Sequence, residues 1–242
     1  MSIVKVGWSG GKDSTCSVLL HLEQGDTVKA VCYIPMFTKN IPLITKKHYE
    51  FIMNTADRLR EMGAEVYIVS GITYCQFVKL VISKGKNKGK IQGFPTPVTG
   101  MCEFKNYSKV KALKKCDVGY FDYEDIGIAY DEPQRKGQLT DSKRSILVEK
   151  QFTEKMAKQK CVEYNMLSPH YENDTRDGCA LCPNAPKKRR LQWFKGFPEA
   201  MPIVVELQEL VKKERPERMP LRNKKLFIDT DQIDMFGNYM IN

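Results

Sequence analysis

Short apolar runs alternate with amphipathic stretches along the first half of the chain. Apolar runs of four to eight residues favour strands, and longer stretches with apolar residues three or four positions apart favour helices. The expected elements are strands at residues 3–8, 28–34 and 65–70 and helices at residues 14–22 and 46–62. Strands separated by helices imply right-handed βαβ units and a ligand site at the carboxyl ends of the strands. The pattern therefore predicts an α/β protein with a Rossmann-like, mostly parallel sheet and helices on both faces.

The second half of the chain is less regular. The pattern predicts helices at residues 74–83, 107–115, 153–164, 187–193 and 201–213, a strand at 118–121 and an extended piece at 126–130. Residues 84–99 are rich in Gly, Lys and Pro and are predicted to form a long exposed loop. The chain length suits an α/β domain over residues 1–182 and a second part over residues 183–242. This second part is a small helical C-terminal extension with a tail, and a Cys-x-x-Cys motif marks its start.

The chain carries a net positive charge, and the length of its apolar runs argues against a membrane-spanning protein. The 242 residues include 39 Lys and Arg against 29 Asp and Glu, a net charge of +10. Basic clusters at residues 84–90 and 187–190 are candidate contacts for nucleic-acid phosphates, although such runs also form ordinary solvated surface. No apolar run approaches the length of a membrane span, so we expect a soluble, cytoplasmic protein with no membrane partner. In that compartment the eight cysteines are expected to be free thiols or metal ligands rather than disulfides.

Six residues join the first predicted strand to the first predicted helix: Ser9, Gly10, Gly11, Lys12, Asp13 and Ser14. Adjacent glycines let the backbone turn sharply and present its N–H groups to an anion, and the helix N-terminus adds the positive end of its dipole. The spacing differs from the Walker A loop, which has four residues between its first glycine and the Gly-Lys pair. The segment therefore predicts a phosphate site. The alternative is a glycine-rich turn without a ligand.

These six residues resemble SGGxDS, the pyrophosphate-binding loop of the PP-loop ATP pyrophosphatase family, also called the adenine nucleotide alpha hydrolases. The family includes phosphoadenosine phosphosulfate reductases, sulfurylase subunits and enzymes that thiolate tRNA or DNA. The resemblance implies a Rossmann-like domain of the HUP type, in which the loop holds the β,γ-pyrophosphate of ATP and the chemistry falls on the α-phosphorus. Beside a triphosphate, Lys12 can offset phosphate charge and Asp13 can hold Mg²⁺ directly or through water, so both are candidate catalytic residues. The alternative for Asp13 is an ordinary partner of the helix dipole.

Cys179 and Cys182 form a second candidate site. Thiolates three positions apart can bind one metal ion or cluster, but a pair alone is not a complete site. Cys102, at the start of a segment that leads into a predicted helix, is the candidate for a further ligand. The sequence therefore predicts that Cys102, Cys179 and Cys182 share one metal centre.

The resemblance extends to this metal centre. Sulfonucleotide reductases that carry a [4Fe–4S] cluster pair a Cys-Cys with a distant Cys-x-x-Cys, and here Met101 stands where the first cysteine of the pair would be. Three matched cysteines resemble the clusters of the tRNA thiolation branch, in which one iron stays open for sulfide or substrate. The alternatives are a structural zinc site completed by Cys116 or His170, and reduced thiols without a ligand. The remaining cysteines are expected to be small buried hydrophobic residues: Cys16, Cys32, Cys75 and Cys161.

Arg135 and Arg176 are candidate clamps for a second anionic group of the substrate, because guanidinium groups pair bidentately with phosphate or sulfate. Ordinary surface arginines are the alternative. We expect an enzyme that binds Mg–ATP, cleaves it between the α and β phosphates and adenylates a substrate. Candidate partners are a tRNA or DNA acceptor and a protein sulfur donor.

Two other functions stay open. The first is a sulfonucleotide reductase, but reductases of the family attack with a cysteine on a C-terminal segment, and no cysteine follows Cys182. The second belongs to another class: a non-catalytic nucleotide-binding or nucleic-acid-binding module with a structural metal. Release of pyrophosphate from ATP separates the adenylating enzyme from both.

Overall fold

The computed structural model describes residues 1–98, 101–173, 178–182 and 184–219, which divide into two compact units. The sheet unit comprises Met1–Ile34, Lys47–Val69 and Ala112–Asp177. The cysteine unit comprises Pro35–Lys46, Ser70–Lys111 and Gly178–Asn242. Each unit combines segments that are distant in sequence. The boundary expected at residue 182 falls inside the cysteine unit.

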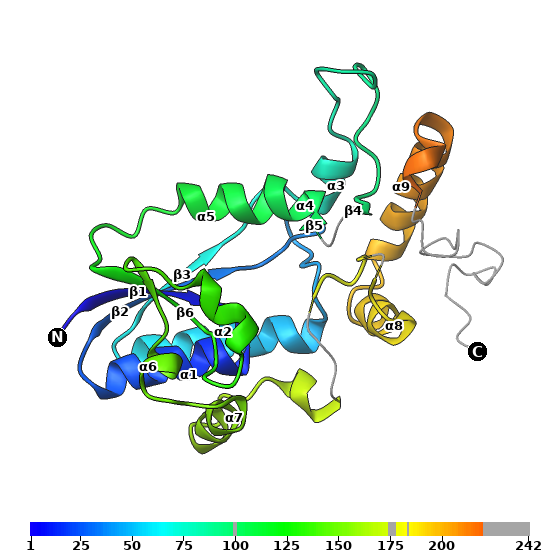
Figure 1. The fold of residues 1–242 in the computed structure, drawn as a ribbon. Helices are drawn as coiled ribbons and strands as arrows, with labels where there is room; N and C mark the ends of the chain where they lie inside the picture. Colours follow the sequence, from blue (N-terminus) through cyan, green and yellow to red (C-terminus); the bar gives the residue numbers. More distant parts are fainter. Residues whose placement is uncertain (99–100, 174–177, 183, 220–242) are drawn as a thin grey trace. The chain divides into compact units, whose positions relative to one another are not determined.

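The described part of the sheet unit is built on a five-stranded, all-parallel sheet in the order β3-β2-β1-β6-β7 (Figure 1). Its strands are β1 (Ile3–Trp8), β2 (Thr27–Tyr33), β3 (Glu65–Val69), β6 (Tyr123–Ile126) and β7 (Lys143–Arg144). Two helices, α1 (Lys12–Glu23) and α2 (Lys46–Glu61), lie on one side of the sheet, and α5 (Lys111–Lys115) lies on the other. The predicted α/β class and parallel sheet are confirmed.

The core of the sheet unit forms around β1 and α1. Val4, Val6 and Trp8 are buried, as the alternation of apolar residues in β1 requires. Trp8 Nε1 donates a hydrogen bond to Thr15 Oγ1 over 2.9 Å, which joins the end of β1 to the second turn of α1. The other side of α1 is covered by α6 (Ile146–Glu149) and α7 (Glu154–Glu163). Coverage on both sides explains why every residue of α1 from Ser14 to His21 is buried.

The strand expected at residues 118–121 is wrong. The fourth strand along the sheet is β6, and Val4 of β1 pairs with its first residue, Tyr123. The apolar residues before β6 have no strand structure: Gly119 has φ of +67°, and the carbonyls of Val118 and Tyr120 accept hydrogen bonds from Lys29 Nζ. The apolar pattern was misleading here because the true strand carries a buried acid.

That acid is Asp125, which is fully buried in β6. Its Oδ2 accepts a hydrogen bond from the Ile146 N–H over 2.7 Å and lies 3.3 Å from His21 Nε2. His21 Nδ1 lies 2.9 Å from Asp26 Oδ2. Burial alone lowers the pKa of His21, but the two carboxylates outweigh it and raise the pKa above its ordinary value. A buried ion pair between α1 and β6 therefore allows a polar residue in the centre of the sheet.

The cysteine unit has an aromatic core. Its helices are α3 (Tyr74–Val78), the run from α4 (Glu103–Lys105) through a π-helical turn (Asn106–Val110), α8 (Lys187–Gly196) and α9 (Ala200–Glu214). The large buried side chains are Phe37, Tyr74, Phe77, Phe94, Phe104, Trp193 and Phe194. Backbone and ring N–H groups tie the separate segments together, since Trp193 Nε1 donates to the Pro42 carbonyl and the Ala180 N–H to the Leu43 carbonyl. Among the described residues, no helix is long and apolar enough to cross a membrane.

The Lys-rich residues of the cysteine unit are exposed and form the tip of a short hairpin. The helix expected at residues 74–83 ends at Val78, and Val81 pairs with Ile91 in an antiparallel bridge. The Ile82 N–H donates to the Lys90 carbonyl and the Gln92 N–H to the Leu80 carbonyl. Val81 and Ile82 are β-branched and favour an extended backbone, which explains the early end of the helix.

Candidate functional site

The glycine loop, residues 9–14, connects β1 to α1. β1 ends at Trp8 and α1 begins at Lys12, with Gly11 in an extended conformation as its N-cap. Gly10 has φ of +75°, and a Cβ at this position would lie 2.9 Å from Ile52 Cγ1. Only glycine combines that backbone conformation with that close approach. The loop therefore lies where the strand and helix patterns placed it.

Two serine hydroxyls fix the shape of the glycine loop. Ser9 Oγ lies 3.1 Å from Ser14 Oγ, and the Ser9 N–H donates to Ser14 Oγ over 3.1 Å. Ser14 Oγ also lies 3.2 Å from the Gly11 carbonyl oxygen, to which it can donate. The first N–H of the helix, that of Lys12, donates to the hydroxyl of Tyr171 over 3.0 Å. The loop is thus held in shape by its own side chains, with the N-terminus of α1 behind it.

The glycine loop lies at the point where the strand order reverses. β2 and β3 lie on one side of β1, and β6 and β7 lie on the other. In open parallel sheets, ligands bind beyond the carboxyl ends of the strands at such a point. Gly127 follows β6 directly, and a Cβ on it would lie 2.7 Å from the backbone N of Ser14. The two loops are therefore in backbone contact, and only glycine fits at residue 127.

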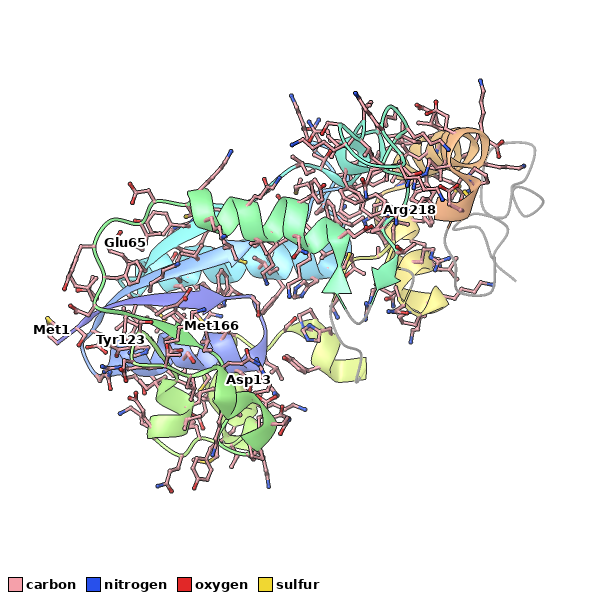
Figure 2. All side chains as sticks on the ribbon, turned by 45° about the horizontal axis from the view of Figure 1, so that its top comes forward. Met1, Asp13, Glu65, Tyr123, Met166 and Arg218 are labelled. Atoms are coloured by element: carbon pink, nitrogen blue, oxygen red, sulfur yellow. The ribbon has the colours of Figure 1, made fainter. Side chains whose placement is uncertain are left out.

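Three carboxylates meet beside the glycine loop. Asp13, Glu132 and Glu154 each offer an oxygen that lies within 4.8 Å of the other two. Asp13 lies at the carboxyl ends of the strands (Figure 2). Lys12 Nζ lies 2.9 Å from both oxygens of Asp13 and 3.4 Å from Glu154 Oε1. Oxygen ligands of this kind suit Mg²⁺, so the residues present fit the expected cation.

The electrostatics of the three carboxylates favour a cation. Burial raises the pKa of Asp13, and Glu154 and Glu132 raise it further, whereas Lys12 opposes this shift. Burial acts to lower the pKa of Lys12, but Asp13 and Glu154 raise it above its ordinary value, so the ammonium stays charged. Sequence reasoning missed Glu132 and Glu154. The available signal was that Glu154 opens α7, where an acid also serves as an ordinary partner of the helix dipole.

The structure gives different outcomes for the two predicted arginine clamps. Arg135 Nη1 lies 3.0 and 2.8 Å from the two carboxylate oxygens of Glu132, so a carboxylate already holds the guanidinium. Its side chain is 40% exposed, which leaves part of the group accessible. Arg176 lies outside the described residues. The substrate-clamp role of both residues stays a prediction.

The three predicted metal ligands all belong to the cysteine unit. Cys102 is the N-cap of α4, and the turn of Cys179 and Cys182 is closed by a hydrogen bond from the Cys182 N–H to the Cys179 carbonyl. Tyr74, between these segments, is buried, and its hydroxyl lies 3.4 Å from the Leu181 carbonyl oxygen inside that turn. Burial raises the pKa of Tyr74, and charge on Cys102, Cys179 and Cys182 raises it further. All three cysteines therefore lie near enough to Tyr74 to act on its pKa.

The other cysteines separate into buried and half-buried groups. Cys16, Cys32 and Cys161 are fully buried, and burial raises the pKa of Cys161 to about 12, so its thiol stays protonated. These three match the expected small hydrophobic residues. Cys75 is only half-buried and also acts on the pKa of Tyr74. Cys116 and His170, the alternative zinc ligands, belong to the sheet unit.

Comparison of the chain with models of known protein families and with curated protein sequences found no match. The family resemblance therefore depends on the sequence motifs of this chain.

Replacing Gly127 by Ala is expected to lower the free energy of unfolding by about 1–3 kcal/mol, because its Cβ would meet backbone atoms that cannot move aside. Chemical denaturation measures this change. Gly137→Ala is the matched control, since nothing lies within 4 Å of a Cβ at that position, and it should change stability by less than about 0.5 kcal/mol. Equal effects of the two substitutions would contradict the backbone contact.

Proposed function

We propose that the chain is a PP-loop ATP pyrophosphatase, similar to phosphoadenosine phosphosulfate reductases, that binds Mg–ATP at residues 9–14 and adenylates a substrate. The observation that carries this proposal is the glycine loop itself. It connects β1 to α1 at the reversal of strand order and lies beside three carboxylates. Backbone N–H groups, a lysine and carboxylates are the groups that hold a magnesium-bound polyphosphate.

The phosphates that the loop would bind determine which phosphorus atom of ATP reacts. With the β,γ-pyrophosphate in the glycine loop, the α-phosphorus is left facing an acceptor oxygen. That oxygen attacks the α-phosphorus, the bond to the bridging oxygen breaks, and pyrophosphate leaves with the electron pair. The loop N–H groups and Lys12 stabilise the charge that gathers on the leaving group. The product is an adenylated substrate, which a sulfur nucleophile can attack with release of AMP.

The charges of the site explain why the nucleotide would bind with a cation. A triphosphate beside Asp13, Glu132 and Glu154 meets like charges, and a divalent cation on these carboxylates turns repulsion into attraction. The cation would supply charge neutralisation at the pyrophosphate. It would also compete with Lys12 for Asp13, which makes the Lys12 ammonium available to a phosphate oxygen.

Inorganic pyrophosphate is expected to displace bound ATP, and AMP to displace it much more weakly, because the loop holds the β and γ phosphates. Asp13→Asn should weaken the Mg²⁺-dependent part of ATP affinity by about 10-fold or more, since it removes a carboxylate ligand. Calorimetric titration of ATP with and without Mg²⁺ measures both effects. With the acceptor present, the products should be pyrophosphate and the adenylated acceptor, and AMP should appear only after a sulfur nucleophile attacks that acceptor.

The matched control is Asp141→Asn, because Asp141 is an exposed acid of the sheet unit outside the three-carboxylate group. It should leave ATP affinity unchanged. Formation of ADP and orthophosphate, or displacement by AMP as effective as by pyrophosphate, would place the chemistry at another phosphate and sink the proposal.

A metal centre on Cys102, Cys179 and Cys182 is the second part of the proposed function. Thiolates suit an iron–sulfur cluster or zinc, and the three cysteines belong to one unit, where each acts on the pKa of Tyr74. A [4Fe–4S] cluster with an open iron would supply a binding position for sulfide from a sulfur donor protein. The reductase alternative would need a cysteine nucleophile beyond Cys182, and residues 183–242 contain none. The non-catalytic alternative would use the same metal for structure alone.

Single serine substitutions of Cys102, Cys179 and Cys182 are each expected to remove most of the bound metal, because they remove ligands of one centre. Metal and acid-labile sulfide analysis of anaerobically purified protein measures this. Cys116→Ser, in the sheet unit, should keep the full metal content. If Cys102→Ser also keeps it, Cys102 is not a ligand. Zinc without sulfide indicates the structural alternative.

The charge distribution supports a nucleic-acid substrate. The cysteine unit contains 22 Lys and Arg against 9 Asp and Glu, whereas the sheet unit contains 17 against 20. The whole positive excess of the chain therefore belongs to one unit. Lys84, Lys86 and Lys88 are exposed in the hairpin and form no ion pair within the described residues. A mononucleotide substrate needs no such surface, but a polyanion does.

Replacing Lys84, Lys86 and Lys88 together by Gln is expected to weaken binding to tRNA or DNA and to flatten the dependence of log K on log salt by about two to three units, because each lost phosphate contact removes about 0.7–0.9 of slope. Fluorescence anisotropy across a salt series measures it. The matched control replaces Lys150, Lys155 and Lys158, exposed lysines of the sheet unit. No binding by the parent protein at low salt would favour a small-molecule acceptor.

A further inference from the structure

The hydroxyl of Tyr171 accepts a hydrogen bond from a backbone N–H of the glycine loop. The Lys12 N–H, the first of α1, donates to the Tyr171 hydroxyl over 3.0 Å. The same hydroxyl would lie 3.4 Å from a Cβ on Gly11, and Lys12 Nζ lies 5.9 Å from the centre of the tyrosine ring. The phenol therefore lies directly against the loop, on the N–H that faces outward from the N-terminus of the helix.

The same N–H is a donor that an anion would use. The first N–H groups of a helix have no partner within the helix, and phosphate groups commonly satisfy them. A phenol oxygen is a neutral acceptor, whereas a phosphate oxygen is charged, and charge-assisted hydrogen bonds are roughly twice as strong as neutral ones. A phosphate in the loop would therefore replace the Tyr171 hydroxyl at Lys12.

Contacts of the neighbouring residues Ser168 and His170 hold Tyr171 against the glycine loop. Ser168 is buried, and its Oγ lies 3.0 Å from His48 Nδ1 and 2.7 Å from His170 Nδ1. The ring of His170 lies 4.1 Å from the ring of Tyr171, centre to centre. His48 belongs to α2, and its Cε1 would lie 3.7 Å from a Cβ on Gly10. The segment of residues 168–171 is thus anchored to α2 on one side and to the glycine loop on the other.

We propose that Tyr171 is a built-in occupant of the glycine loop, whose hydroxyl must leave the Lys12 N–H before a phosphate group can bind there. The proposal rests on the phosphate site of the proposed function and adds a regulatory contact to it. The anchored segment of residues 168–171 then sets part of the affinity of the loop, because phosphate binding has to break the hydrogen bond of Tyr171 to the Lys12 N–H.

Tyr171→Phe is expected to bind inorganic pyrophosphate about 2- to 10-fold more tightly than the parent protein, because the free state loses a hydrogen bond that the bound state does not use. Isothermal titration with pyrophosphate and Mg²⁺ measures this. Tyr164→Phe is the matched control. The Tyr164 hydroxyl also donates a hydrogen bond, over 2.6 Å to Glu23, but Tyr164 is the C-cap of α7 and has no contact with the loop. Its affinity should equal that of the parent.

Tyr171→Ala provides a second variant that removes the ring as well as the hydroxyl, and it should also bind pyrophosphate more tightly. Thermal unfolding of each variant checks that the fold is kept. If the parent binds pyrophosphate and Tyr171→Phe binds it equally or more weakly, the hydroxyl is not a competitor and this inference alone is overturned. If the folded parent and both variants fail to bind pyrophosphate, the phosphate site of the proposed function is overturned with it.

Discussion

The contact between β6 and α1 is the constraint on which the sheet unit depends. At one point the chain after β6 passes so close to Ser14 that no side chain fits on Gly127. At another, Asp125 of β6 lies beside His21 near the other end of α1. Because both contacts involve the same helix, the pairing of β6 with β1 also sets the position of the glycine loop. The position of the candidate site is therefore a consequence of the pairing of β6 with β1.

The second physical feature is the balance of charge beside the glycine loop. Asp13, Glu132 and Glu154 face Lys12 and Arg135, so three negative groups are offset by two positive ones within hydrogen-bonding distance. Such a site gains little from a bare anion and much from an anion that arrives with a divalent cation. This balance adds to the glycine loop, which carries the proposal, a reason for the nucleotide to bind as Mg–ATP.

The cysteine unit combines an aromatic core, a positive net charge and the three candidate metal ligands. Its core is aromatic and assembled from three separate segments, and its hydrogen bonds run between them, as from Trp193 to the Pro42 carbonyl. The same unit holds the positive excess of the chain and the three candidate metal ligands. The proposed division of roles, with ATP at the sheet unit and a polyanion at the cysteine unit, reflects this separation of charge.

The sequence by itself determined the elements whose pattern is local. β1, β2, β3, α1 and α2 were predicted within one or two residues at each end, and the glycine loop was found between them, because hydrophobic periodicity and adjacent glycines act over a few residues. The Cys179 and Cys182 pair was legible for the same reason.

Only the tertiary structure decided which distant residues meet. The strand β6 was misplaced because its buried Asp125 is compensated by His21, a residue that no local pattern connects to it. Glu132 and Glu154 lie beside Asp13, and Cys102 belongs to the same unit as Cys179 and Cys182, although the members of each set are distant in sequence. A carboxylate or a thiol has the same appearance in the sequence whether it faces solvent or a partner. Its neighbours, which set its burial and charge, are chosen by the fold.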